Sequence, residues 1–134
     1  METIRVAIVD DQIIFRRALR GFLARKDGIE VVAEAGDGYS AVRIVEEHHP
    51  DVVLMDINMP LRDGIEATRI ITAKFPKTSV IVLSMGEDDV SSTRAYQAGA
   101  FYYLSKSCSC MDILRAVKSC SMSQFSAAGQ KLAF

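Results

Sequence analysis

The 134-residue sequence lacks a long apolar run, an excess of either charge and a cysteine framework. Its uncharged apolar stretches, such as residues 80–83, are far shorter than the roughly 18 residues of a membrane span. Asp10 and Asp11 interrupt the region where the apolar segment of a signal peptide would continue. The 16 basic and 17 acidic residues give a net charge of −1, which argues against a global basic field for nucleic acid. We therefore expect a cytoplasmic protein that does not contact a membrane.

The few cysteines and histidines offer no metal-binding pattern. Cys108, Cys110 and Cys120 supply neither a disulfide framework nor two CxxC pairs for zinc, and we expect ordinary side chains near one helix. His48 and His49 are adjacent, so they do not share a helix face, and we expect both at the C-terminus of a helix.

Strand-like and helix-like segments alternate along the chain. Apolar residues make up 49% and charged residues 25%, as in an ordinary single globular domain. Short runs rich in Val and Ile predict buried parallel strands, and the segments between them have helical periodicity. Because crossovers between parallel strands are right-handed, we predict a flavodoxin-like, doubly wound α/β sheet of order 2-1-3-4-5 with five helices. The predicted strands are 4–9, 29–35, 51–55, 79–83 and 101–104, and the predicted helices are 12–26, 39–48, 65–74, 88–98 and 111–119.

Three segments carry more specific expectations. The helix at 88–98 has the weakest apolar stripe, so we expect it to be the least firmly held element. From residue 121 the composition changes to Ser, Gln, Ala and Gly, which predicts a domain of residues 1–120 followed by a linker or C-terminal tail at 121–134. The first helix is expected to bury one face that consists of Ile14, Phe15, Ala18, Leu19, Phe22 and Leu23.

Charged and hydroxyl side chains follow the predicted strands. Asp10 and Asp11 follow the first strand, Asp56 the third, Ser84 the fourth and Lys106 the fifth. Ligand sites in open α/β sheets lie beyond these carboxyl ends, and strands one and three should be neighbours, so the three carboxylates should converge. Two unit charges about 4 Å apart repel by about 4 kcal/mol at an effective dielectric of 20. We therefore predict that Lys106 and a divalent cation such as Mg²⁺ offset this charge.

Each of these residues also has an ordinary structural explanation. Asp11 alone would be a helix N-cap, Ser84 alone a turn residue and Lys106 alone a solvated cation. Asp56 is harder to explain in this way, because it follows a buried apolar strand where an uncompensated acid is costly. All four explanations would have to hold together at matching strand ends, which favours a common site.

Four separated motifs resemble the receiver domain of two-component response regulators over about residues 4–120. The motifs are residues 9–11, residues 56–60 with 63–64, Ser84 and residues 99–106. Ser107 stands where a proline usually follows the lysine of receivers. In this non-proline residue the sequence resembles the receivers of LuxR/NarL-type DNA-binding regulators. That similarity implies transcriptional output through a helix-turn-helix domain outside this chain.

The resemblance implies a role for each acidic residue. Asp56 would be the phosphoacceptor and would receive a phosphoryl group from a sensor histidine kinase. Asp11, Asp56 and the backbone carbonyl of Asn58 would bind Mg²⁺ or Mn²⁺, and Asp10 would act mainly through water. The protein would then be a phosphoaccepting switch that assists only its own phosphorylation and dephosphorylation.

The resemblance also implies a conformational switch. Lys106 would offset charge on the transferring oxygens, and Ser84 would bind an oxygen of the phosphoryl group. Movement of Ser84 would open space for Tyr103 and repack the loop after the fourth strand, with homodimer formation as a possible result. The basic side of the first helix is either a solvated face or a contact surface for the kinase; it consists of Arg16, Arg17, Arg20, Arg25 and Lys26.

Three alternatives use parts of the same pattern. A haloacid-dehalogenase-type phosphatase also combines an Asp nucleophile, Mg²⁺, a hydroxyl and a lysine, but it needs a second acid where this sequence has Asn58. A flavodoxin-like FMN carrier needs a hydroxyl- and glycine-rich phosphate loop where this sequence has Asp10 and Asp11. A degenerate receiver that acts only as a protein-interaction module would not need the acceptor, acid pair, hydroxyl and lysine together.

Overall fold

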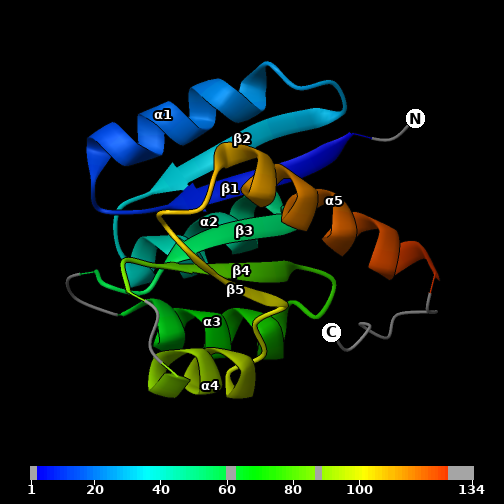
Figure 1. Cartoon of the computed structure of the whole chain (residues 1–134). Helices are drawn as coiled ribbons and strands as arrows, with labels where there is room; N and C mark the ends of the chain where they lie inside the picture. Colours follow the sequence, from blue (N-terminus) through cyan, green and yellow to red (C-terminus); the bar gives the residue numbers. More distant parts are fainter. Residues whose placement is uncertain (1–2, 60–62, 87–88, 127–134) are drawn as a thin grey trace.

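A single parallel sheet of order β2-β1-β3-β4-β5 forms the centre of the molecule, which confirms the predicted topology (Figure 1). The computed structural model describes residues 3–59, 63–86 and 89–126. Each strand lies within one residue at either end of its predicted range. The strands are β1 (Ile4–Val9), β2 (Ile29–Ala35), β3 (Val52–Asp56), β4 (Ser79–Ser84) and β5 (Tyr102–Ser105).

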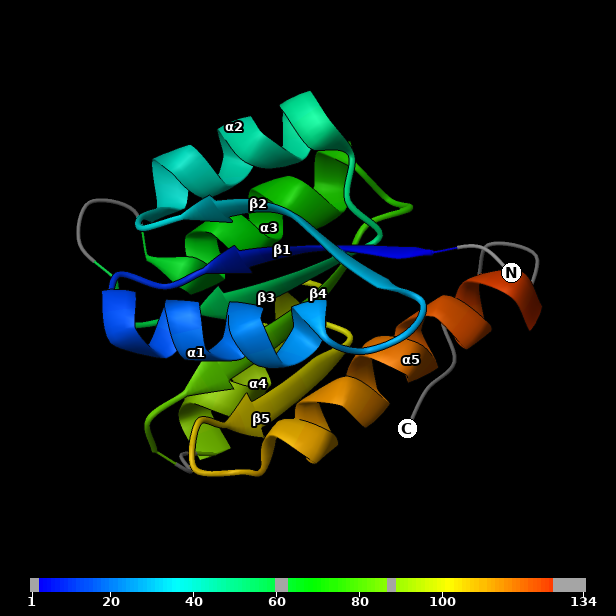
Figure 2. The ribbon, with the colours of Figure 1, turned by 90° about the horizontal axis from the view of Figure 1, so that it is seen from above.

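Helices cover both faces of the sheet, as the alternating pattern predicts. One face is covered by α1 (Ile13–Ala24) and α5 (Cys110–Ser126), and the other by α2 (Gly38–His48) and α3 (Gly64–Lys74) (Figure 2). The remaining helix, α4 (Asp89–Gln97), contributes Ala95 to the same apolar cluster as α2 and α3. The sheet is therefore the middle layer of three.

Alternation along the strands divides the core into two apolar clusters. In β1, Val6 and Ile8 pack with residues of α1 and α5, whereas Ala7 and Val9 pack with residues of α2 and α3. Every residue of the central strands β3 and β4 is buried. Strands covered on both faces must be apolar throughout, which is why these segments read as continuous apolar runs.

The predicted apolar face of α1 was too wide. Ile14 is 87% exposed, whereas Leu19 and Leu23 are buried. At 3.6 residues per turn, Ile14 lies about 180° around the helix from Leu23, so both side chains cannot face the sheet. Among the other predicted members, Ala18 is exposed, and Phe15 and Phe22 are half-buried.

Every helix begins within one residue of its predicted start, and α1 ends at Ala24, two residues early. Three further features of the helix ends differ from the sequence expectations. Gln12, not Asp11, is the N-cap of α1, and its side chain makes no capping hydrogen bond. His49 is outside α2 as its C-cap, in the left-handed region with φ 47°. Helix α5 continues to Ser126, although composition predicted its end at residue 119. The added segment includes Met122 and Gln124, which are good helix formers, so a change in composition does not by itself end a helix. The linker or tail at 121–134 stays a prediction, and residues 127–134 lie outside the described part.

The three cysteines lie near one helix, as the sequence analysis expects. Cys110 and Cys120 belong to α5, Cys108 precedes it by two residues, and all three are free thiols. Among the helices of the described ranges, none is long and apolar enough to span a membrane.

Gly64 is the glycine whose replacement should disturb the sheet edge most. A Cβ at this position would collide with the carbonyl oxygen of Asp56 and lie 2.7 Å from Cα of Ile57, both rigid backbone atoms. We expect Gly64→Ala to lower the free energy of unfolding by about 1–3 kcal/mol through overpacking. The matched control is Gly21→Ala inside α1, where no atom lies within 4 Å of the new methyl and a gain of about 0.5–1 kcal/mol is expected. Urea unfolding of both variants measures the difference, and equal shifts would contradict the close approach.

Candidate functional site

Three carboxylates meet at the carboxyl edge of the sheet. Asp10 and Asp11 follow β1, and Asp56 ends β3, the strand that pairs with β1 through Val9 and Met55. One carboxylate oxygen of each acid lies within 4.8 Å of the others. Asp10 and Asp56 are buried and Asp11 is exposed, so the cluster opens to solvent on the side of Asp11.

Lys106 lies against both buried acids. Its Nζ is 2.7 Å from Oδ2 of Asp10 and 3.4 Å from Oδ2 of Asp56, and its side chain is only 5% exposed. The ammonium also donates a hydrogen bond of 3.2 Å to Oε1 of Gln12 and lies 4.8 Å from the ring centroid of Phe15. One cation faces three carboxylates here, so the cluster keeps a net negative charge.

The oxygen donors of the cluster fit a hard divalent cation. Oδ1 of Asp10 accepts the Gln12 backbone N–H at 2.8 Å, and Oδ1 of Asp56 accepts that of Asn58 at 3.1 Å. Oδ2 of Asp10 is buried and receives no hydrogen bond within the described ranges, because its close contact with Lys106 lacks hydrogen-bond geometry. Lys106 already brings positive charge to this oxygen, but one ammonium does not offset the charge of three ionised carboxylates within 4.8 Å of one another. Carboxylates and carbonyls are the ligands that Mg²⁺ prefers.

Burial is the main reason that the pKa of Asp56 is raised, to about 6 from 3.8. The charge of Asp10 raises the pKa further, while the Asn58 N–H and Lys106 lower it. Without a cation, Asp56 therefore holds a proton more strongly than an exposed carboxyl does. Positive charge beside it would favour the carboxylate, which is the form that can act as a nucleophile.

Ser84 and Tyr103 both bind the backbone of Gly86. Ser84 is the last residue of β4 and is buried, and its Oγ accepts the Gly86 N–H at 3.3 Å. The Tyr103 hydroxyl on β5 donates to the Gly86 carbonyl at 3.2 Å. Beside them, the Lys106 N–H donates to the Ser84 carbonyl at 2.8 Å, so the two strand ends stay paired. A movement of Ser84 would therefore be felt at Gly86, the residue whose carbonyl binds Tyr103.

Sequence reasoning missed three residues that contact this cluster. Gln12 and Phe15 both contact Lys106, and Arg16 donates to the backbone carbonyl of Asp10 at 2.6 Å. No motif marks these residues, because each acts through a partner distant in sequence or through backbone. The predicted motif also includes Pro60, which lies outside the described residues, as do residues 87–88 of the loop after β4.

The raised pKa of Asp56 predicts a pH dependence of stability without metal. The folded state binds this proton more tightly than the unfolded chain does, so the stabilisation is complete below about pH 4 and is lost as the pH rises through about 6. Relative to Asp56→Asn, the wild type should lose about 1–3 kcal/mol of unfolding free energy between about pH 4 and about pH 7.5 in chelator. Urea unfolding of both proteins across this range tests it; a difference that does not change with pH would contradict the assignment.

A family model and curated relatives both match this chain to one protein family. Residues 6–118 match the model of the response regulator receiver domain. The transcriptional regulatory protein DegU of Brevibacillus brevis is 42% identical over 115 residues, which cover 86% of this chain and 49% of DegU. The chain thus spans about half the length of the curated relatives it matches.

Solved structures give the same result. The signal receiver domain of NarL from Mycobacterium tuberculosis superposes with a TM-score of 0.87 at 31% identity, covering 91% of this chain and 98% of that one. CheY in a CheX–CheY–BeF₃–Mg²⁺ complex from Borrelia burgdorferi superposes with a TM-score of 0.80 at 27% identity, covering 88% and 89%. Receiver domains are signalling switches that bind Mg²⁺ at an acidic pocket. This chain has the strand order given above and an acidic cluster at the carboxyl edge of its sheet. The chain belongs to the receiver domain family of two-component response regulators.

Proposed function

We propose that Asp56 of this receiver domain accepts a phosphoryl group from a histidine kinase in a Mg²⁺-dependent reaction. The observation that carries the proposal is the contact of one buried ammonium, Lys106, with the buried carboxylates of Asp10 and Asp56 beside exposed Asp11. Receivers of response regulators take phosphoryl groups from histidine kinases, and this cluster has the groups that such a transfer needs.

The transfer is a nucleophilic displacement at phosphorus. A carboxylate oxygen of Asp56 forms the new P–O bond while the P–N bond to the kinase histidine breaks, and the electron pair of that bond leaves with the imidazole. Lys106 lies within 3.4 Å of the acceptor carboxylate and would offset charge on the phosphoryl oxygens. The proposed ligands of Mg²⁺ or Mn²⁺ are Asp11, Asp56 and the Asn58 carbonyl, with Asp10 acting mainly through water. When bound, the ion supplies further charge to the transferring oxygens.

The switch follows from the shared contact at Gly86. A phosphoryl group on Asp56 offers strong acceptor oxygens, to which the Ser84 hydroxyl would donate. Ser84 would then give up its hydrogen bond with the Gly86 N–H, and the backbone at Gly86 would shift. Tyr103 would lose its acceptor, the Gly86 carbonyl, and move inward. To turn a 1:99 equilibrium into 99:1, the phosphoryl group must favour the second arrangement by about 5.5 kcal/mol. Two charge-assisted contacts and a metal ion are sufficient for that difference.

The output of the whole protein belongs to the same proposal. DegU is named as a transcriptional regulatory protein, and this chain covers 49% of it. We propose transcriptional control through a DNA-binding domain outside this chain, with homodimer formation on phosphorylation. The cytoplasm, where kinase and DNA are both accessible, is the proposed location. The basic side of α1 is either a solvated face or the contact surface for the kinase.

Phosphorylation can be tested with a small phosphodonor. We expect acetyl phosphate with Mg²⁺ to add one phosphoryl group to the wild type and none to Asp56→Asn, as measured by intact mass. The matched control is Asp63→Asn, at an exposed carboxylate that caps α3 by accepting the Glu66 N–H, which should label like the wild type. Equal labelling of wild type and Asp56→Asn, or none of either, would remove the assignment. Sustained turnover of phosphomonoesters would instead favour a phosphatase.

The switch can be tested at Tyr103. Tyr103→Ala should leave labelling of Asp56 unchanged, because the side chain binds Gly86 rather than the acidic cluster. It should reduce by at least about twofold the phosphorylation-dependent change in dimer fraction or in amide exchange over residues 84–106. Tyr103→Phe, which loses only the hydroxyl bond, separates that bond from the ring. If the phosphorylated wild type shows no change in either readout, the switch mechanism is wrong.

A further inference from the structure

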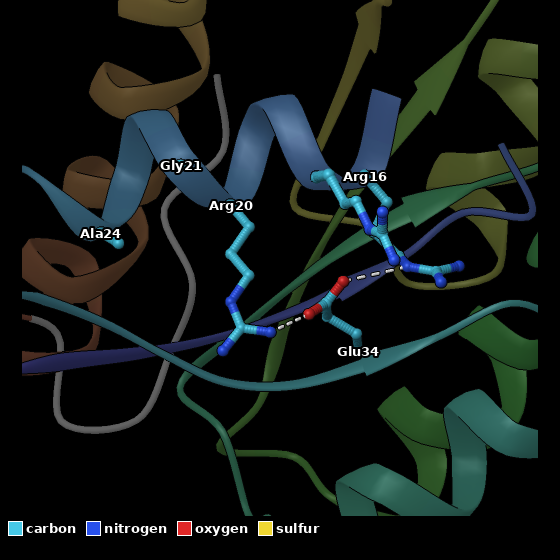
Figure 3. Close-up of a pocket in the computed structure, with 6 residues that line it drawn as sticks. Arg16, Arg20, Gly21, Ala24 and Glu34 are labelled. Carbon is cyan, nitrogen blue, oxygen red and sulfur yellow. Dashed lines mark hydrogen bonds and ion pairs between the residues drawn. The ribbon is translucent and has the colours of Figure 1, made fainter. Parts of the chain in front are cut away.

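Arg16 joins the edge strand β2 to the loop that carries the acid pair. Its Nε donates to Oε1 of Glu34 at 3.0 Å (Figure 3). Its Nη1 donates to the backbone carbonyl of Asp10 at 2.6 Å. The Arg16 side chain is 19% exposed, whereas that of Arg20 is 55% exposed. One half-buried guanidinium thus bridges two segments that the sequence separates.

The bridged carbonyl belongs to the peptide bond between the two acids. Its orientation therefore constrains how Asp10 and Asp11 project from the end of β1. The same loop is held on its other side, because the Asp10 N–H donates to the Ala35 carbonyl at 3.0 Å. Glu34 and Ala35 are consecutive residues of β2, so this edge strand fixes the acid pair through both its backbone and a side chain.

We propose that Arg16 is a positioning residue for cation binding. It holds the Asp10–Asp11 peptide in the orientation that directs both carboxylates toward the site, and Glu34 holds Arg16 in place. The proposal rests on the Mg²⁺ site of the proposed function and adds two residues that do not touch the ion. A guanidinium is suited to this role because its planar fork can donate in two directions at once, which a lysine ammonium on a flexible stem does less well.

The direction in which Mg²⁺ affinity changes when Arg16 is removed separates a positioning role from a purely electrostatic one. Arg16 is a positive charge near an acidic site, so removing the charge alone would reduce repulsion and tighten Mg²⁺ binding. Removing a group that orients the ligands has the opposite effect, and partners behind metal ligands typically change metal affinity by about 10-fold or more. A merely structural ion pair would lower thermal stability and leave metal affinity unchanged.

Arg20 provides a matched control within the same cluster. It lies on the helix turn after Arg16 and also forms an ion pair with Glu34 (Figure 3). Within the described residues it makes no hydrogen bond or ion pair with Asp10. Arg20→Ala also removes one positive charge from α1 and one ion pair from Glu34. Its effect on Mg²⁺ binding therefore measures charge and ion-pair loss without loss of the loop contact.

The test is Mg²⁺ affinity by titration calorimetry, together with amide hydrogen exchange of the metal-free protein. We expect Arg16→Ala to raise the Mg²⁺ Kd about 10-fold and to speed exchange at residues 10–13. Arg16→Lys should restore the charge but recover less than half of the lost affinity on a logarithmic scale. Glu34→Gln should be intermediate, and Arg20→Ala should stay within about twofold of the wild type. Thermal unfolding identifies any variant that is not folded at the titration temperature.

The outcomes distinguish this inference from the function on which it rests. A wild-type chain that binds no Mg²⁺ overturns the proposed function and this inference with it. Where the wild type binds, an unchanged or lower Kd in Arg16→Ala overturns the positioning role alone, as does equal weakening in Arg16→Ala and Arg20→Ala. If Arg16→Ala does not fold, Glu34→Gln gives the decision, because unaltered Mg²⁺ binding in it overturns the role of the pair.

Discussion

One buried ammonium between two buried carboxylates is the interaction on which the site depends. Lys106 follows β5, while Asp10 and Asp56 belong to the ends of β1 and β3. Because β4 lies between β3 and β5, the lysine side chain must extend past the end of β4 to reach both acids. Breaking a buried ion pair by removing one partner typically costs about 3–5 kcal/mol, so the cluster holds the ends of β1, β3 and β5 in one arrangement. Any group that enters the site acts on a network that already couples these strands.

The backbone of Gly86 extends this coupling away from the acids. Its N–H is bound by Ser84, which ends β4 beside Asp56, and its carbonyl is bound by Tyr103 on the edge strand β5. The two peptide units that flank one residue therefore connect a buried hydroxyl with a half-buried aromatic ring. This arrangement needs no long pathway, because the two side chains compete for the position of one backbone segment.

The central strands were predictable because strands buried on both faces are apolar except at their ends, as β3 and β4 are. The convergence of the acids followed from the expectation that the first and third strands are neighbours, since the carboxyl ends of neighbouring parallel strands share one edge. Finer features were not predictable. The exposure of Ile14 depends on where the helix faces, and an apolar residue does not reveal this by itself. The contact of Arg16 with the Asp10 carbonyl involves backbone on one side, and the Arg16–Glu34 pair joins residues 18 positions apart, so neither leaves a local pattern.

The distribution of the cysteines also has a practical consequence. Cys110 is exposed at the first position of α5, whereas Cys120 is buried in the apolar cluster between α5 and the sheet. Cys108 is half-buried, and burial raises the pKa of its thiol, which lowers its thiolate fraction and so its reactivity. Thiol reagents therefore reach Cys110 first. A spin label or fluorophore attached there would report on the junction of β5 and α5 without any engineered cysteine.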